Sequence, residues 1–215
     1  PIVEPELYEQ STTLLNTFHL GTEAGNAIAD VLFGKYNPSG KLTMSIPRAI
    51  GQIPVYYNHK SAGRPSPGPG DEGSVFWSHF NDEENTPQYP FGYGISYTTF
   101  EYSAPELSGS TMGMNETVEV SVDVTNTGDF DGEEVVQFYI RDRFASTMRP
   151  VQELKGFEKV MIKKGETKTI TFTIDKETLS FYTHKGEWVA EPGMFSIMIG
   201  GSSDNVQMVE LELLD

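Results

Sequence analysis

The second half of the chain alternates apolar and polar residues in several short runs. Residues 118–124, 170–174 and 195–199 each place an apolar side chain at every second position. This period of two is typical of strands that bury one face. Turn-forming sequences such as Asn126-Thr127-Gly128 and Pro192-Gly193 separate the runs. About seven such strands in residues 100–215 predict an all-β, immunoglobulin-like sandwich.

The first part of the chain shows less regularity. Apolar residues at positions 24, 27, 28, 31 and 32 follow one helix face, with Thr22 as a candidate cap and Gly34 beyond the end. Alternation in 42–46 predicts a strand, and the apolar segment 14–20 predicts a second helix. This is too little for a closed α/β domain. We therefore expect residues 1–58 to be an incomplete α/β sandwich remnant whose missing strands come from elsewhere.

Residues 59–99 change character again. The segment 66–73 is rich in Gly and Pro, which disfavours both helix and strand, and aromatic residues are dense around it. Disordered linkers are normally poor in aromatic residues. The segment is therefore predicted to be a long ordered loop that wraps over a surface.

Composition narrows the classes of function. The chain has 15 Lys and Arg against 31 Asp and Glu, a net charge of −16. So acidic a chain disfavours nucleic-acid binding, which needs a basic patch, and anionic membranes. It has no apolar run near the roughly 20 residues that span a bilayer. It also has no Cys, so disulfides and thiolate chemistry are excluded. Neutral partners such as sugars remain open.

Several strings in the chain resemble family 3 glycoside hydrolases and follow one another in that family's order. They are residues 21–34 (GTEAGNAIADVLFG), 36–42 (YNPSGKL), 51–58 (GQIPVYYN), 63–65 (GRP), 89–100 (YPFGYGISYTTF), 153–157 (ELKGF) and 191–193 (EPG). Each string alone is a weak signal. Together they make a strong resemblance that covers nearly the whole chain.

The resemblance implies a domain organisation. In that family an N-terminal barrel supplies an Asp nucleophile, a second α/β sandwich domain often supplies the acid/base, and a fibronectin type III-like domain closes the chain. Residues 1–58 then end the second domain, 59–99 connect, and 100–215 form the third. The expected fold class is α+β and multidomain, an α/β sandwich remnant followed by an immunoglobulin or fibronectin type III-like β-sandwich. No residue matches the nucleophile, so no catalytic residue is assigned.

Candidate sugar contacts lie in the connecting loop. Arg64, Phe76 and Trp77 combine a cation with aromatic rings, which stack on the apolar faces of sugars. Asp82 precedes the Tyr-Pro-Phe-Gly string and is a further candidate substrate-binding residue. The alternative is that Arg64 and the aromatic residues anchor the loop, and that Asp82 is structural or solvated. We expect the loop to act as a spacer and partial lid at the active site of the parent enzyme.

Metal and cofactor sites are not predicted. The four histidines, at positions 19, 59, 79 and 184, show no ligand spacing. Residues 129–133 resemble half a calcium loop, but Phe138 stands where such a loop needs Glu, so a hairpin turn is the interpretation.

Two functions of different class remain. The first is the C-terminal piece of a retaining, exo-acting β-glycosidase of β-glucosidase type, inactive by itself and working in the periplasm or outside the cell. Its partners are a terminal β-D-glycoside substrate and the upstream barrel. The alternative is a stand-alone scaffold whose fibronectin-like domain binds carbohydrate or protein. The chain opens on Pro1-Ile2-Val3 with neither Met nor a signal peptide, so we expect it to be cut from something longer. This favours the enzyme, because a scaffold has no reason to begin in mid-domain.

Overall fold

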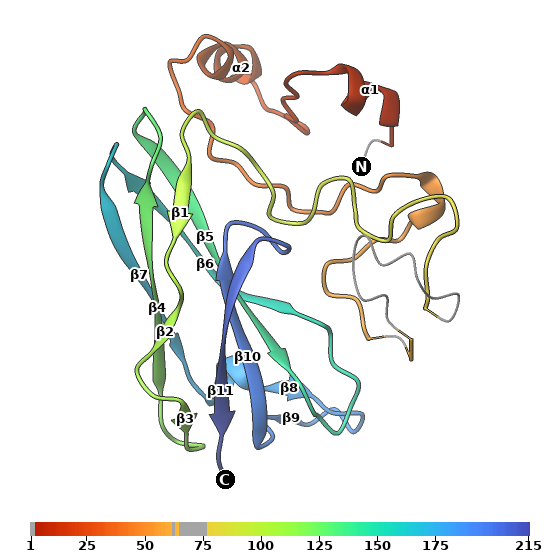
Figure 1. The fold of residues 1–215 in the computed structure, drawn as a ribbon, viewed down its shortest axis with the longest axis vertical. Coiled ribbons are helices and arrows are strands. Elements are labelled where there is room, and N and C mark those ends of the chain that lie inside the picture. The colour runs from red at the N-terminus through yellow and green to blue at the C-terminus, as the bar shows by residue number, and fades with distance from the viewer. Residues whose placement is uncertain (1–2, 62, 65–76) are drawn as a thin grey trace.

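A β-sandwich dominates the computed structural model of the chain, which describes residues 3–61, 63–64 and 77–215 (Figure 1). In the first sheet the central strand is β4, which pairs with β7 on one edge and with β1 and β2, end to end, on the other. The bounds are β1 (Phe100–Tyr102), β2 (Glu106–Leu107), β4 (Val118–Asn126) and β7 (Thr167–Ile174). All of these pairs are antiparallel.

The second sheet has five strands in the order β3-β11-β10-β5-β6. Their bounds are β3 (Thr111–Met112), β5 (Gly132–Asp142), β6 (Glu153–Ile162), β10 (Gly193–Gly200) and β11 (Val206–Leu213). The short β3 runs parallel to β11, and the other pairs are antiparallel. Two facing sheets of this kind confirm the predicted immunoglobulin-like fold.

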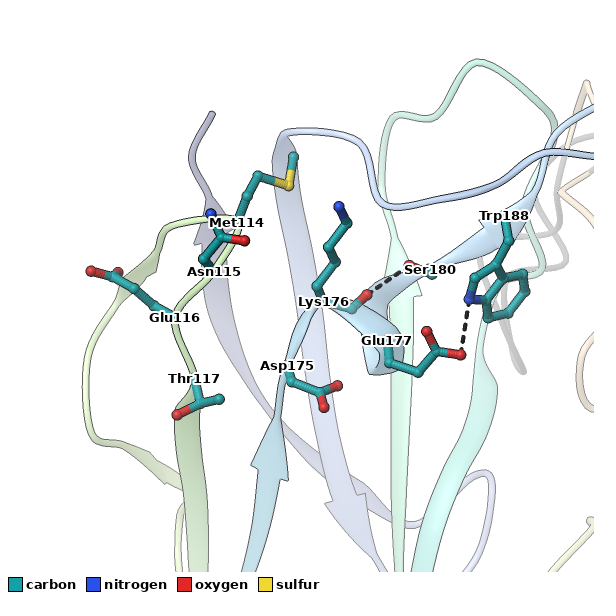
Figure 2. Close-up of a pocket in the computed structure, with 9 residues that line it drawn as sticks. All are labelled: Met114, Asn115, Glu116, Thr117, Asp175, Lys176, Glu177, Ser180 and Trp188. Atoms are coloured by element: carbon teal, nitrogen blue, oxygen red, sulfur yellow. Dashed lines mark hydrogen bonds between the residues drawn. The ribbon is translucent and has the colours of Figure 1, made fainter.

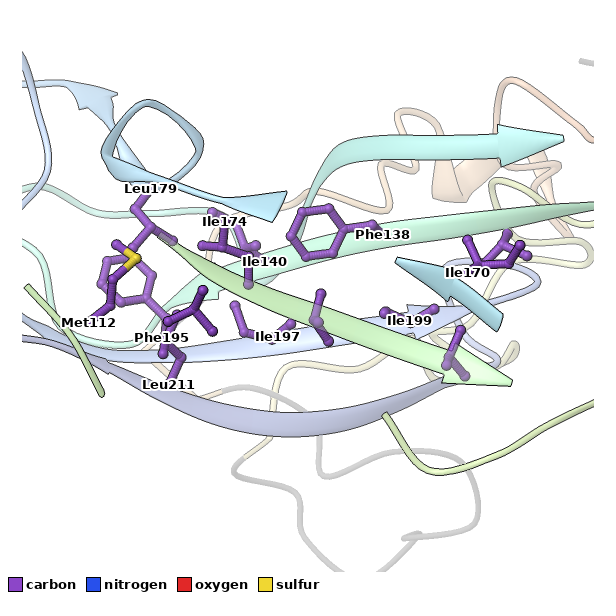
Figure 3. Close-up of a cluster of buried hydrophobic side chains, with 14 of the residues drawn as sticks. Met112, Phe138, Ile140, Ile170, Ile174, Leu179, Phe195, Ile197, Ile199 and Leu211 are labelled. Atoms are coloured by element: carbon purple, nitrogen blue, oxygen red, sulfur yellow. The ribbon is translucent and has the colours of Figure 1, made fainter. Parts of the chain in front are cut away.

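The core lies between the two sheets (Figure 3). The alternating apolar residues of β4 and β10 point into it, since Val120, Val124, Phe195 and Ile197 are fully buried. All members of this cluster lie between residues 100 and 213. The sandwich therefore supplies its own hydrophobic core.

A small layer closes one end of the sandwich. Strands β8 (Phe181–Tyr182) and β9 (Trp188–Val189) form a hairpin, preceded by the one-turn helix α3 (Lys176–Leu179). Figure 1 shows this hairpin at the end opposite to α1 and α2. Leu179 and Phe181 are almost completely buried, so the layer is anchored in the core.

The N-terminal region contains helices α1 (Pro5–Gln10) and α2 (Ala24–Leu32) and the single 3-10 turn η1 (Ile50–Gln52). The predicted helix at 24–32 is confirmed, and Gly34 follows it with φ +72°. Its N-cap is Glu23 rather than Thr22, and no side chain caps it. Leu32 and Phe33 at its end are exposed, the latter at 88%.

Two predicted elements are absent. Residues 14–20 are not helical, because Phe18 has φ +46° and its N–H donates to Asn16 Oδ1, which makes a local turn. Residues 42–46 form no strand beyond one bridge, from Ile46 to Tyr89. Leu42 and Ile46 hydrogen-bond with residues 88–93, but Pro90 has no N–H to continue a ladder.

Candidate functional site

Two of the predicted sugar-contacting residues, Arg64 and Trp77, lie where the connecting loop closes on itself. The N–H of Ser78 donates to the carbonyl of Arg64 at 2.9 Å. The two ends of the loop that carry Arg64 and Trp77 therefore lie next to each other. The indole of Trp77 is 38% exposed, and its carbonyl lies 2.8 Å from Nδ1 of His79. Phe76 lies outside the described residues. The structure thus brings two of the four candidates together.

The three acidic residues at positions 82–84 of the loop have different surroundings: two lie near Arg48, and one faces solvent. Glu84 lies 3.2 Å from the guanidinium of Arg48, and Glu83 lies 4.0 Å from it. Asp82 is exposed and makes no hydrogen bond or ion pair within the described residues. A retaining glycosidase needs two carboxyl groups about 5 Å apart across the scissile bond. Since its neighbours are tied to Arg48, Asp82 is the carboxylate of this cluster that is open to a ligand.

Asn85 clamps the segment that follows Trp77. Its Oδ1 accepts from the N–H of Phe80, and its Nδ2 donates to the carbonyl of Ser78. One side chain therefore replaces the backbone ladder that a regular element would provide.

Arg48 and Gln52 support this segment from below, and sequence reasoning did not single them out. The guanidinium of Arg48 donates to the carbonyl and hydroxyl of Thr86 and to Gln88 Oε1. The buried amide of Gln52 donates to the carbonyls of Glu84 and Thr86, while its Oε1 accepts from the N–H of Arg48. We name these two residues the bracket. Gln52 lies within the string 51–58 that resembles family 3 glycoside hydrolases, and this was the sequence signal that could have identified it.

A buried ion pair joins the N-terminal region to the sandwich. Lys41 Nζ lies 3.2 Å from Glu134 Oε2 and donates to the carbonyl of Gly94. The hydroxyl of Tyr102 donates to Glu134 Oε1 at 2.8 Å. Burial, together with the charge and hydrogen bond of Glu134, raises the pKa of Tyr102 far above its usual value. Both charges are well shielded, so the pair fixes the position of residues 41 and 94 on β5.

A second contact covers the outer face of the same sheet. Gln137 Nε2 donates to the carbonyls of Gly92 and Gly201, and the hydroxyl of Tyr139 donates to Gln137 Oε1. The ring of Tyr57 stacks on Phe91 at 4.2 Å and meets the edge of Tyr139 at 5.9 Å. Gly92 has φ +79° and a Cβ there would lie 1.9 Å from Gln137 Oε1, so this position requires glycine.

The string 36–42 makes a third set of contacts to the sandwich. The Tyr36 and Ser39 hydroxyls both donate to Glu133 Oε2, and the Asn37 amide donates to the Asp131 carbonyl. The hydrogen bond from Lys159, with that from Tyr36, lowers the pKa of Glu133. The strings 36–42 and 89–100 therefore dock the N-terminal region on the sandwich.

The described residues do not assemble a metal centre. No group of three or more His, Cys, Asp or Glu with suitable placement occurs among them. The turn at 127–131 that resembled half a calcium loop joins β4 to β5. These strands lie in different sheets, so the predicted hairpin turn is wrong and the segment is a connection between the sheets. Asp129 there pairs with Lys164 at 2.7 Å. The candidate site is thus a polar loop beside the sandwich, in which Trp77 and Asp82 are exposed.

An α/β remnant docked on an immunoglobulin-like sandwich agrees with what protein-family models find. The model "Glycosyl hydrolase family 3 C-terminal domain" matches residues 1–97, and "Fibronectin type III-like domain" matches residues 134–203. The chain therefore belongs to glycoside hydrolase family 3, of which it represents a C-terminal portion.

Curated relatives agree with this assignment. A periplasmic β-glucosidase from Salmonella typhimurium is 51% identical over 96% of the chain, and a β-xylosidase from Formosa agariphila is 43% identical over 94%. In both cases the matched region is 27% of the relative, so the chain spans about a quarter of the length of these proteins.

Solved structures show the same relationship. The β-glucosidase from Listeria innocua superposes on 99% of the chain with a TM-score of 0.91 and 46% identity, over 29% of its own length. A variant of that enzyme has been solved in complex with laminaribiose, with a TM-score of 0.90. Within the part of the chain that the structure describes, no helix is long and apolar enough to cross a membrane.

Proposed function

We propose that the chain is the C-terminal portion of a retaining, exo-acting β-glycosidase that removes terminal non-reducing β-D-glycosyl units. The observation that carries this proposal is the similarity to β-glucosidases and a β-xylosidase over almost the entire chain. The Listeria relative binds laminaribiose, a β-linked disaccharide, which supports a β-linked glucoside as substrate. The resemblance assigns no nucleophile to these residues, so the portion alone is expected to be inactive.

The contribution of this portion is to hold one loop at the substrate site. The bracket and Asn85 fix the segment 78–88, and that segment in turn fixes the position of Arg64 through Ser78. Arg64, Phe76, Trp77 and Asp82 are the proposed substrate-binding residues. Residues 1–58, 59–99 and 100–215 are the proposed end of the α/β domain, connecting loop and fibronectin type III-like domain.

The partner of the N-terminal region is the remainder of the parent enzyme, including its barrel. Exposed apolar side chains support this, since Leu32, Phe33, Ile50 and Ile95 are each at least 61% exposed. Apolar surface of this kind favours association. The name of the Salmonella relative supports a periplasmic or secreted location.

Two measurements test the function. The purified chain should show no turnover of an aryl β-glucoside, whereas the intact parent should turn it over and release the β-anomer first, as observed by NMR. On laminari-oligosaccharides the parent should release single sugars from one end. Release of the α-anomer, or of internal fragments, would contradict the proposal.

A further inference from the structure

A shallow pocket of about 400 Å³ lies at the end of the sandwich that carries α3 and the β8–β9 hairpin (Figure 2). It is formed where the turn between β3 and β4 faces α3 and the β8–β9 hairpin. The lining residues are Met114, Asn115, Glu116, Thr117, Asp175, Lys176, Glu177, Ser180 and Trp188. None of them belongs to the loop at which the substrate residues meet.

An oriented aromatic ring forms one wall of this pocket. Trp188 is 43% exposed, and its Nε1 donates to Glu177 Oε1 at 2.9 Å, as Figure 2 shows. Tyr182 is its cross-strand neighbour, 68% exposed, with ring centroids 4.6 Å apart. Two adjacent exposed aromatic rings offer an apolar surface on which a ligand can stack. The bond to Glu177 also satisfies the polar edge of the indole, and Trp188 stays partly exposed although Tyr182 packs against it.

The support beneath the ring is rigid. Asp175 caps α3 by accepting from the N–H and the hydroxyl of Thr178, and the Ser180 hydroxyl donates to the Lys176 carbonyl. Leu179 and Phe181, on either side of Ser180, are buried in the core. A binding ring on such a base loses little conformational entropy when a ligand binds.

Some polar side chains of the pocket have hydrogen-bond partners within the protein, and others have none. Glu116 is occupied by the N–H of Gly113, and Glu177 by Trp188. In the described parts of the chain, the side chains of Asn115, Thr117 and Lys176 have no hydrogen-bond or ion-pair partner. An ammonium, an amide and a hydroxyl are thus available beside an indole face.

Charge decides the class of ligand. Glu116, Asp175 and Glu177 outnumber the single Lys176, so the pocket repels anions. A neutral polyhydroxyl ring fits the remaining chemistry, because its C–H face stacks on the indole and its hydroxyls bond to the amide and ammonium. We propose that this pocket is a carbohydrate-binding site for neutral β-linked gluco-oligosaccharides, separate from the catalytic site. The choice of glucose as the sugar rests on the proposed function.

The test is binding of laminaritetraose to the whole chain, followed by NMR or calorimetry. Wild type should bind, and Trp188→Ala should bind about tenfold more weakly or not at all. Asn115→Ala and Lys176→Ala, both at exposed positions, should weaken binding several-fold while leaving the melting temperature unchanged. They keep the test valid if Trp188→Ala folds poorly.

The matched control is Phe130→Ala, which removes a 60%-exposed aromatic ring from the turn between β4 and β5 at the opposite end. It should bind as wild type does. Tri-galacturonate, an anionic probe, should not bind. The inference is overturned if wild type does not bind laminaritetraose, if Trp188→Ala binds it equally well, or if the anionic probe binds as tightly. These measurements need no turnover, so they fail independently of the proposed glycosidase activity.

Discussion

The sandwich of residues 100–215 and the region before it are stabilised in different ways. The core cluster of the sandwich is drawn entirely from residues of the sandwich itself, between positions 100 and 213. Among the described residues before position 100, the buried apolar ones are Ile46, Pro47 and Pro90 alone. That region contains two short helices and one 3-10 turn, and its order comes from side-chain hydrogen bonds to the sandwich and within the loop.

This difference shows what each region does. Burial of apolar surface is non-directional and gives the sandwich a stable body. Specific hydrogen bonds such as Gln137 to Gly92 hold an irregular chain in one position, which burial alone cannot do. The sandwich is therefore a base, and the preceding region carries the residues that we propose to bind substrate.

The largest expected effect comes from separating the two regions. Residues 100–215 expressed alone should give one cooperative thermal transition with dispersed amide resonances, because their core is complete. Residues 1–99 alone should give no cooperative transition. A cooperative melt of 1–99, or its absence for 100–215, would reverse the comparison.

One Phe→Ala substitution in each region allows their contributions to the free energy of unfolding to be compared. Phe195→Ala removes a fully buried ring from β10 and should lower the free energy of unfolding by about 3–5 kcal/mol. Phe33→Ala removes a ring that is 88% exposed and should change it by less than about 0.5 kcal/mol in the isolated chain. Chemical denaturation measures both. In the intact parent, Phe33→Ala should become destabilising if the proposed partner covers it.

The ion pair between the regions gives the next effect. Lys41→Met leaves Glu134, whose side chain is 5% exposed, without its cation and should cost about 3 kcal/mol. Lys41→Met combined with Glu134→Gln should recover most of this, because no charge is left buried. The control is Lys35→Met, which breaks the exposed pair with Asp30 and should have no measurable effect. Equal losses for the single and double variants would show that the buried charge is not the cause.

A smaller effect concerns the cap of α3. Hydrogen bonds from Thr178 lower the pKa of Asp175, so its charged form is stabilised in the folded state. This stability is present above the unfolded pKa of about 3.9 and is lost as pH falls through the folded value. Asp175→Ala should cost about 1 kcal/mol at pH 7, and the difference from wild type should vanish in strong acid. Glu101→Ala, at an exposed position on β1, is the control, and a pH-independent cost for Asp175→Ala would contradict the capping role.

The sandwich was predictable because its strands carry their own signal. The period of two identified the buried positions of β4 and of the core face of β10, whereas Ser196 and Met198 on the other face of β10 are buried too. It did not predict that Tyr139 and Gln137 of β5 are buried as well. Their burial comes from Tyr57 and Gly92, which lie far away in the sequence. Burial by residues that are distant in the sequence leaves no local pattern of apolar and polar positions.

The preceding region was harder to predict for the same physical reason. Apolar residues at 14–20 and 42–46 suggested regular elements, but a turn at Phe18 and the missing N–H of Pro90 prevented them. The loop candidates could be named from residue type alone; the carbonyl of Arg64 accepts from Ser78, next to Trp77, and the substrate role of these residues stays a prediction. The bracket, Arg48 and Gln52, was missed because long-range hydrogen bonds to backbone carbonyls have no spacing rule.

The smallest expected effect addresses whether the loop presents Trp77 to substrate or merely anchors itself with it. In the intact enzyme, Trp77→Ala should raise KM for laminari-oligosaccharides about threefold and leave KM for aryl β-glucosides unchanged, because the lost stacking involves only the outer sugars. Tyr56→Ala removes another exposed ring of the N-terminal region and serves as the control, with both KM values unchanged. If Trp77→Ala instead lowers the melting temperature with unchanged kinetics on both substrates, the indole is an anchor. Arg64, Phe76 and Asp82 would then be the remaining candidate contacts of the loop.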